Sequence, residues 1–134
     1  MPSWLECDEG HGSNTLLYDA AIALSKSRPP RCRRCGKPFH YYVEHRYANV
    51  KGEKNCYEAI QIVRINMRPR MDRFDPFLLR LQHCDDPKNI KLLPIFWAPD
   101  KTGRIRVGQF PPLLSPQDWK NAFRKLKIEI STLN

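Results

Sequence analysis

The sequence lacks the features of membrane and secreted proteins. No stretch approaches the roughly 18 consecutive apolar residues of a membrane helix, which excludes a helical span. Residues 1–25 hold four acidic side chains and no basic one, so they lack the basic start of a secretory or transit peptide. We therefore expect a cytoplasmic protein that has no membrane partner.

Familiar catalytic motifs are also missing. The chain has no glycine-rich phosphate loop, no Gly-x-Ser-x-Gly elbow and no His-Glu-x-x-His helix. A metal-dependent nuclease is one alternative, because nucleases of the HNH type often carry Cys-x-x-Cys pairs and the middle of this chain is basic. However, His40 and His45 would point to opposite faces of a strand and could not share a metal ion. The sequence therefore favours a non-catalytic protein over an enzyme.

Glycine is scarce, and proline is twice as frequent. Six glycines and 12 prolines argue against long helices, because proline cannot donate a hydrogen bond inside a helix. The 134 residues, 41% hydrophobic and 28% charged, suffice for one core. We expect a single domain over residues 1–134. Its parts are a metal-binding N-terminal part at 1–38, a β-meander at 39–110 and a C-terminal helix at 115–130.

The spacing of apolar residues predicts an α+β fold with a mostly antiparallel sheet of about five strands and a helix at each end. The first helix is expected from Ser13 or Asn14 to about Lys26. An alternation of period two then predicts the strands. They cover 39–47, 56–67, 77–83, 90–97 and 104–109.

Two details of this sheet can be tested. In the second strand, Tyr57 and Val63 are predicted on one face, whereas Ile60 and Ile62 are predicted on the other. With both faces partly apolar, this strand is expected near the centre of the sheet. For residues 76–84, a helix capped by Asp75 is the alternative to a strand.

The last helix has the clearest start. Ser115 is a capping residue, Pro116 suits the first helical position and Asp118 places an acid in the first turn. An apolar stripe from Trp119 to Ile130 should dock on the sheet. The basic residues of this helix are predicted to face solvent: Lys120, Arg124, Lys125 and Lys127.

The most specific motif is Cys32-Arg-Arg-Cys35-Gly36-Lys37-Pro38. Two cysteines separated by two residues can coordinate one metal ion, and Gly36 permits the tight turn that such coordination needs. Residues 32–38 resemble the metal knuckle of zinc ribbons and rubredoxin-like domains. The resemblance implies a bound metal and a β-hairpin after the knuckle. Reactive thiols and plain unliganded thiols are the alternatives.

A closed tetrahedral site needs two more ligands. Cys7 and His11 are the preferred pair, since they also lie in a short turn and Gly12 follows His11 as Gly36 follows Cys35. The predicted cofactor is therefore a structural Zn²⁺ held by Cys7, His11, Cys32 and Cys35. Three residues could substitute for the first pair: Cys56, His83 and Cys84.

The net charge of +9 suggests a polyanionic partner. Residues 26–80 carry 14 bases and 5 acids, and such a field attracts nucleic acid, either DNA or RNA. Basic side chains near the knuckle would contact phosphates, and an exposed aromatic of the first strand would stack on a base. The predicted contacts are Arg31, Arg33, Arg34, Lys37, Tyr42 and Arg46.

A protein partner is the alternative to nucleic acid. The basic residues could be an ordinary solvated surface, and the apolar segment 110–114 could contact another protein. In that case the chain is an interaction module or accessory subunit held together by its metal. The function expected first is nevertheless a small, non-catalytic zinc-binding protein that binds nucleic acid.

Overall fold

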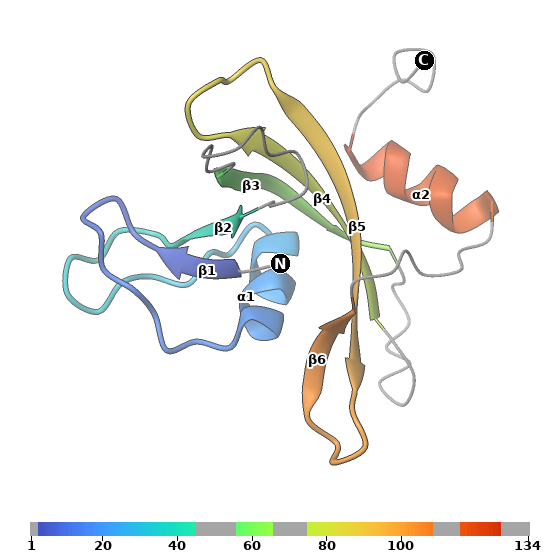
Figure 1. The fold of residues 1–134 in the computed structure, drawn as a ribbon, viewed down its shortest axis with the longest axis horizontal. Coiled ribbons are helices and arrows are strands. Elements are labelled where there is room, and N and C mark those ends of the chain that lie inside the picture. Colours follow the sequence, from blue (N-terminus) through green and yellow to red (C-terminus); the bar gives the residue numbers. More distant parts are fainter. Residues whose placement is uncertain (1–2, 45–55, 66–74, 109–115, 127–134) are drawn as a thin grey trace, which may run out of the picture.

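A computed structural model describes residues 3–44, 56–65, 75–108 and 116–126 (Figure 1). These ranges contain six strands and two helices. In chain order they are β1 (Ser3–Glu6), α1 (Leu17–Ser25), β2 (His40–Glu44), β3 (Cys56–Arg64), β4 (Asp75–His83), β5 (Ile90–Pro99), β6 (Ile105–Gly108) and α2 (Pro116–Leu126). Neither helix is long and apolar enough to cross a membrane.

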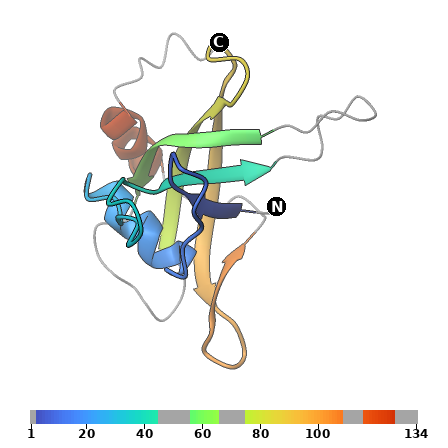
Figure 2. The same ribbon diagram turned by 90° about the vertical axis from the view of Figure 1, so that its left-hand side faces the viewer.

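The strands form one antiparallel sheet in the order β1-β2-β3-β4-β5-β6. The predicted α+β class and mostly antiparallel sheet are thus confirmed, with six described strands where about five were expected. β3 lies in the middle of the sheet, as its two partly apolar faces predicted. Figures 1 and 2 show that the sheet is strongly curled.

The two helices cover opposite faces of the sheet (Figure 1). Helix α1 lies inside the curl, near β3 and near both edge strands, β1 and β6. Its Ala20 and Ala21 are fully buried, because only small side chains allow this close approach. Helix α2 packs on the outer face near β3 and buries Ala122 and Leu126.

Strand β4 is buried on both faces. Phe77 and Leu79 face α1 in the larger core, whereas Leu78 joins the smaller core under α2. All three side chains are at most 1% exposed. The helical alternative for 76–84 is therefore wrong: alternate side chains of this segment serve two different cores, which a strand achieves and a helix does not.

Strand β1 is the additional strand. No strand was expected before residue 39, but Trp4 pairs with Tyr42 and Leu5 pairs with Tyr41 of β2. The strand has four residues, and Leu5 is its only buried side chain. A strand of this length shows too little alternation of apolar and polar residues to be detected in the sequence.

The predicted faces of β3 are wrong after residue 59. The pairing register with β4 shifts between Ala59 and Gln61, which marks a bulge at Ile60. The extra residue reverses the two faces that follow, so Ile62 enters the core with Tyr57 while Val63 lies under α2. Ile60 itself is 43% exposed.

The helix boundaries also differ from prediction. Helix α1 begins at Leu17, and neither Ser13 nor Asn14 caps it; the Ser13 hydroxyl accepts a hydrogen bond from the Thr15 amide instead. In α2, Lys125 does not project freely into solvent, because its Nζ donates to the carbonyl oxygen of Arg64 at 2.9 Å. Some predicted features lie outside the described residues, namely Ser115, residues 45–47, 66–67 and 127–130, Gln109 and segment 110–114.

Candidate metal centre

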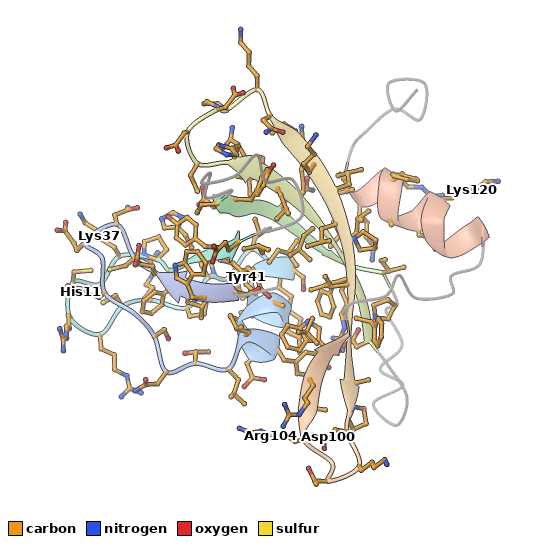
Figure 3. All side chains as sticks on the ribbon, viewed as in Figure 1. His11, Lys37, Tyr41, Asp100, Arg104 and Lys120 are labelled. Carbon is orange, nitrogen blue, oxygen red and sulfur yellow. The ribbon has the colours of Figure 1, made fainter. Side chains whose placement is uncertain are left out.

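Two turns bring the four predicted ligand residues together. The ligand atoms of the group all lie within 4.8 Å of one another, and the group consists of Cys7, His11, Cys32 and Cys35. Cys7 and Cys32 are almost fully buried, with exposed fractions of 2% and 5%. Figure 3 shows His11 and Lys37, one from each turn, at the same end of the molecule.

The first turn follows β1. The Gly10 amide donates to the Cys7 carbonyl oxygen at 2.9 Å, and the Cys7 amide donates to the His11 carbonyl oxygen at 3.0 Å. The His11 amide points at the Cys7 sulfur at 3.4 Å. The glycine with positive φ is Gly10, at 81°, and not Gly12 as expected. The left-handed residue thus precedes the second ligand in this turn.

The second turn has the features expected of a knuckle. The Gly36 amide donates to the Cys32 carbonyl oxygen and the Cys32 amide donates to the Lys37 carbonyl oxygen, both at 2.8 Å. The Arg34 amide points at the Cys32 sulfur at 3.4 Å. Gly36 has a φ of 75°, which a residue with a Cβ rarely adopts. The turn is thus compatible with a metal knuckle, and β2 follows it.

Two of the distances between ligand atoms match those of a tetrahedral zinc site. The sulfurs of Cys7 and Cys35 are 3.6 Å apart, and the Cys32 sulfur is 3.5 Å from Nδ1 of His11. With Zn–S bonds of about 2.3 Å and a Zn–N bond of about 2.0 Å, a tetrahedral site separates its ligand atoms by about 3.5 to 3.8 Å. Two pairs of ligand atoms thus have the separation found in a tetrahedral site, and the four residues together form a group that could hold one metal ion.

The turns also adjust the acidity of the thiols. Burial raises the pKa of Cys32, but hydrogen bonds from the backbone amides of Cys35 and Arg34 and from His11 outweigh it and lower the pKa to about 6. The Lys37 amide lowers the pKa of Cys35, but burial and the thiols of Cys7 and Cys32 outweigh it and raise that pKa. Cys32 is therefore largely the thiolate at neutral pH, which is the form that binds metal.

Charged side chains tie the first turn to its surroundings. Lys37 Nζ lies 2.5 Å from a Glu9 carboxylate oxygen and joins the two turns to each other. The His40 ring lies between two carboxylates, with Asp8 2.8 Å from Nε2 and Glu58 2.5 Å from Nδ1. Nothing in the sequence indicates that Asp8 and Glu58 meet His40.

The other cysteines lie apart from this group. Cys56 and Cys84 face each other across β3 and β4, with their sulfurs 2.7 Å apart. The structure therefore does not bring them to the ligand cluster as substitutes for Cys7 and His11. His83 is likewise engaged elsewhere, with its ring against Tyr57.

The residues predicted to bind nucleic acid divide into separate groups. Four lie on the second turn and are exposed: Arg31, Arg33, Arg34 and Lys37. Tyr42 lies on β2 between Trp4 and Glu58, and burial and the charges of Glu58 and Glu6 raise its pKa to about 12. Two carboxylates thus lie near Tyr42, and carboxylates repel phosphate. Arg46 lies outside the described residues.

The comparisons with known proteins found no similarity: no family model matches the chain, and neither does any curated protein or solved structure. The resemblance to a metal knuckle thus remains a local one. What can be inferred about function depends on the residues of the chain itself.

Proposed function

We propose that Cys7, His11, Cys32 and Cys35 bind one Zn²⁺ ion with a structural role. The observation that carries the proposal is the grouping of the four ligand atoms within 4.8 Å. Three thiols and one imidazole are a ligand set that zinc prefers. Because all four positions are taken by the protein, no position is left for a reacting water, so the ion would not be catalytic.

The ion would join two segments that lie outside the helices and the strands of the sheet. Residues 7–16 and 26–39 contain no helix and no strand of the sheet, apart from isolated bridges at Gly12, Arg31 and Pro38. Binding would displace the proton that Cys35 holds, so zinc affinity would increase with pH. Metal removal is expected to release both turns while leaving the β3–β4–β5 core folded.

We further propose that the second turn contacts the phosphate backbone of nucleic acid. Residues 26–38 contain six basic side chains and no acidic one, and all six are exposed: Lys26, Arg28, Arg31, Arg33, Arg34 and Lys37. A rigid turn that presents several cations favours a polyanion. Tyr42 is left out of this surface because of its acidic neighbours.

The test is the binding of a labelled single-stranded oligonucleotide at increasing salt concentrations. Replacing Arg33 and Arg34 together with Ala should weaken binding and reduce the slope of log affinity against log salt by about 2. The matched control is the Lys88→Ala, Lys91→Ala double variant, which removes two exposed charges beside the β4–β5 turn. Equal effects of the two double variants, or no binding at low salt, would contradict the proposal.

A further inference from the structure

Cys56 and Cys84 occupy directly opposed positions on neighbouring strands. Cys56 opens β3, Cys84 follows β4, and the pairing of Tyr57 with His83 sets them opposite each other. The Cys84 amide donates to the Cys56 carbonyl oxygen at 2.9 Å. Opposed residues of antiparallel strands have Cα atoms about 4.5 to 5.5 Å apart, a separation that a disulfide can span.

The side chains are also in position. The two sulfurs are 2.7 Å apart, clearly closer than the 3.6 Å between Cys7 and Cys35 in the metal cluster. To form a bond, the sulfurs must approach each other to about 2.05 Å. Cys84 is exposed and Cys56 is half-buried, so a small oxidant can reach the pair from solvent.

Among the described residues, the pair has no further ligands that would make it a second metal site. Within the described ranges, only the Cys7 cluster brings three or more Cys, His, Asp or Glu ligand atoms together. The nearest candidate along the chain is His83, but its Nδ1 accepts a hydrogen bond from the Asp85 amide at 3.0 Å. Two thiols without further ligands have the composition of a redox-active dithiol.

We propose that Cys56 and Cys84 are a site of reversible oxidative modification, at which a peroxide converts the two thiols into a disulfide. The Cys56 sulfur attacks one peroxide oxygen and forms a sulfenic acid as the O–O bond breaks, and the leaving hydroxide takes up the thiol proton to become water. The Cys84 sulfur then attacks the sulfenic sulfur, and the hydroxyl group leaves with the second thiol proton as water. The two electrons lost by the sulfurs reduce one peroxide to two waters. A dithiol reductant reverses the reaction by exchange.

The surroundings of the pair determine its reactivity. Burial, the hydrogen bond to Cys56 and the carboxylates of Asp85 and Glu58 raise the pKa of Cys84 to about 12. Because the thiolate is the reactive form, oxidation should be slow at pH 7 and faster at higher pH. Cys7 and Cys32 are buried, and a bound zinc ion would hold their thiolates, so both should react more slowly still in the zinc-loaded chain.

The experiment treats the full zinc-loaded chain with hydrogen peroxide and then blocks free thiols with an alkylating reagent. The intact mass should decrease by about 2 Da, the mass of two hydrogen atoms, before alkylation. A non-reducing digest should contain one peptide pair joined through Cys56 and Cys84, and dithiothreitol should restore both thiols. Oxidation should also increase the melting temperature, since the bond closes a long loop.

Matched variants identify the residues. Cys56→Ser and Cys84→Ser should each abolish the intramolecular cross-link and the increase in melting temperature. If a variant fails to fold, the peptide map of the oxidised protein without substitutions still shows which cysteines are joined. Full alkylation of Cys56 and Cys84 after peroxide treatment, or a disulfide to any of the other three cysteines, would overturn the proposal.

Discussion

The Tyr18 hydroxyl donates a 2.7 Å hydrogen bond to the Asp75 carboxylate, 57 residues further along the chain. Asp75 is 7% exposed and also accepts two hydrogen bonds from the Arg64 guanidinium, from Nε at 3.0 Å and from Nη2 at 2.5 Å. One carboxylate thus connects α1 to β3 and β4. A buried carboxylate that accepts three hydrogen bonds from two partners is strongly held in place.

Asp75→Asn should destabilise the fold considerably. The neutral amide cannot balance the charge of Arg64, and breaking a buried ion pair costs about 3 kcal/mol or more. Tyr18→Phe should cost about 1 kcal/mol, because it removes one hydrogen bond. Urea unfolding measures both. Asp85→Asn, at an exposed turn, is the matched control and should change the free energy of unfolding by less than about 0.5 kcal/mol.

The same cluster predicts sensitivity to base. Burial, together with the hydrogen bond to Asp75, raises the pKa of Tyr18 to about 12, above its usual value of 10.0. A pKa that is higher in the folded state stabilises the fold fully below pH 10, and this contribution is lost as pH increases toward 12. The melting temperature should therefore decrease over that interval, and it should decrease less in Tyr18→Phe. An identical decrease in both proteins would contradict the assignment.

The bulge in β3 predicts opposite outcomes for two isoleucines. Ile62 is 5% exposed and packs in the larger core, so Ile62→Ala should cost about 2 to 5 kcal/mol. Ile60 is 43% exposed, so Ile60→Ala should cost less than about 1 kcal/mol. The two substitutions are chemically identical and serve as controls for each other. Equal losses would mean that the two side chains share a face.

Much of the fold could be predicted because it depends on local patterns. The alternation at Phe77, Leu79 and Leu81 identified β4, and Pro116 marked the start of α2. The bulge at Ile60 could not be predicted, because it is visible only in the pairing of β3 with β4. Strand β1 was missed for a related reason, since its partner β2 lies far along the chain.

The candidate site was likewise predictable only where it depends on local sequence. The short spacings from Cys7 to His11 and from Cys32 to Cys35 pointed to the four ligand residues, because each turn is a local structure. The contacts around them join distant segments, such as Asp8 and Glu58 at His40, and no local pattern reveals them. The clustering of Tyr18, Arg64 and Asp75 was hidden in the same way.

Loss of one ligand should loosen the two turns but not the sheet core. In Cys35→Ser, amide hydrogen exchange should become fast in residues 3–12 and 30–38 and stay slow in β4, because a site with only three ligands binds zinc more weakly. Cys84→Ser is the matched control, since it removes a thiol outside the cluster. Unchanged exchange in Cys35→Ser would show that the turns hold without the ion.

The most direct test of the central claim is the zinc content of the purified chain, measured by elemental analysis together with protein concentration. We predict one zinc per chain, and none in a variant with Ser at both Cys32 and Cys35. A chain that is fully folded at both turns and contains no bound metal after purification in the presence of zinc would contradict the account.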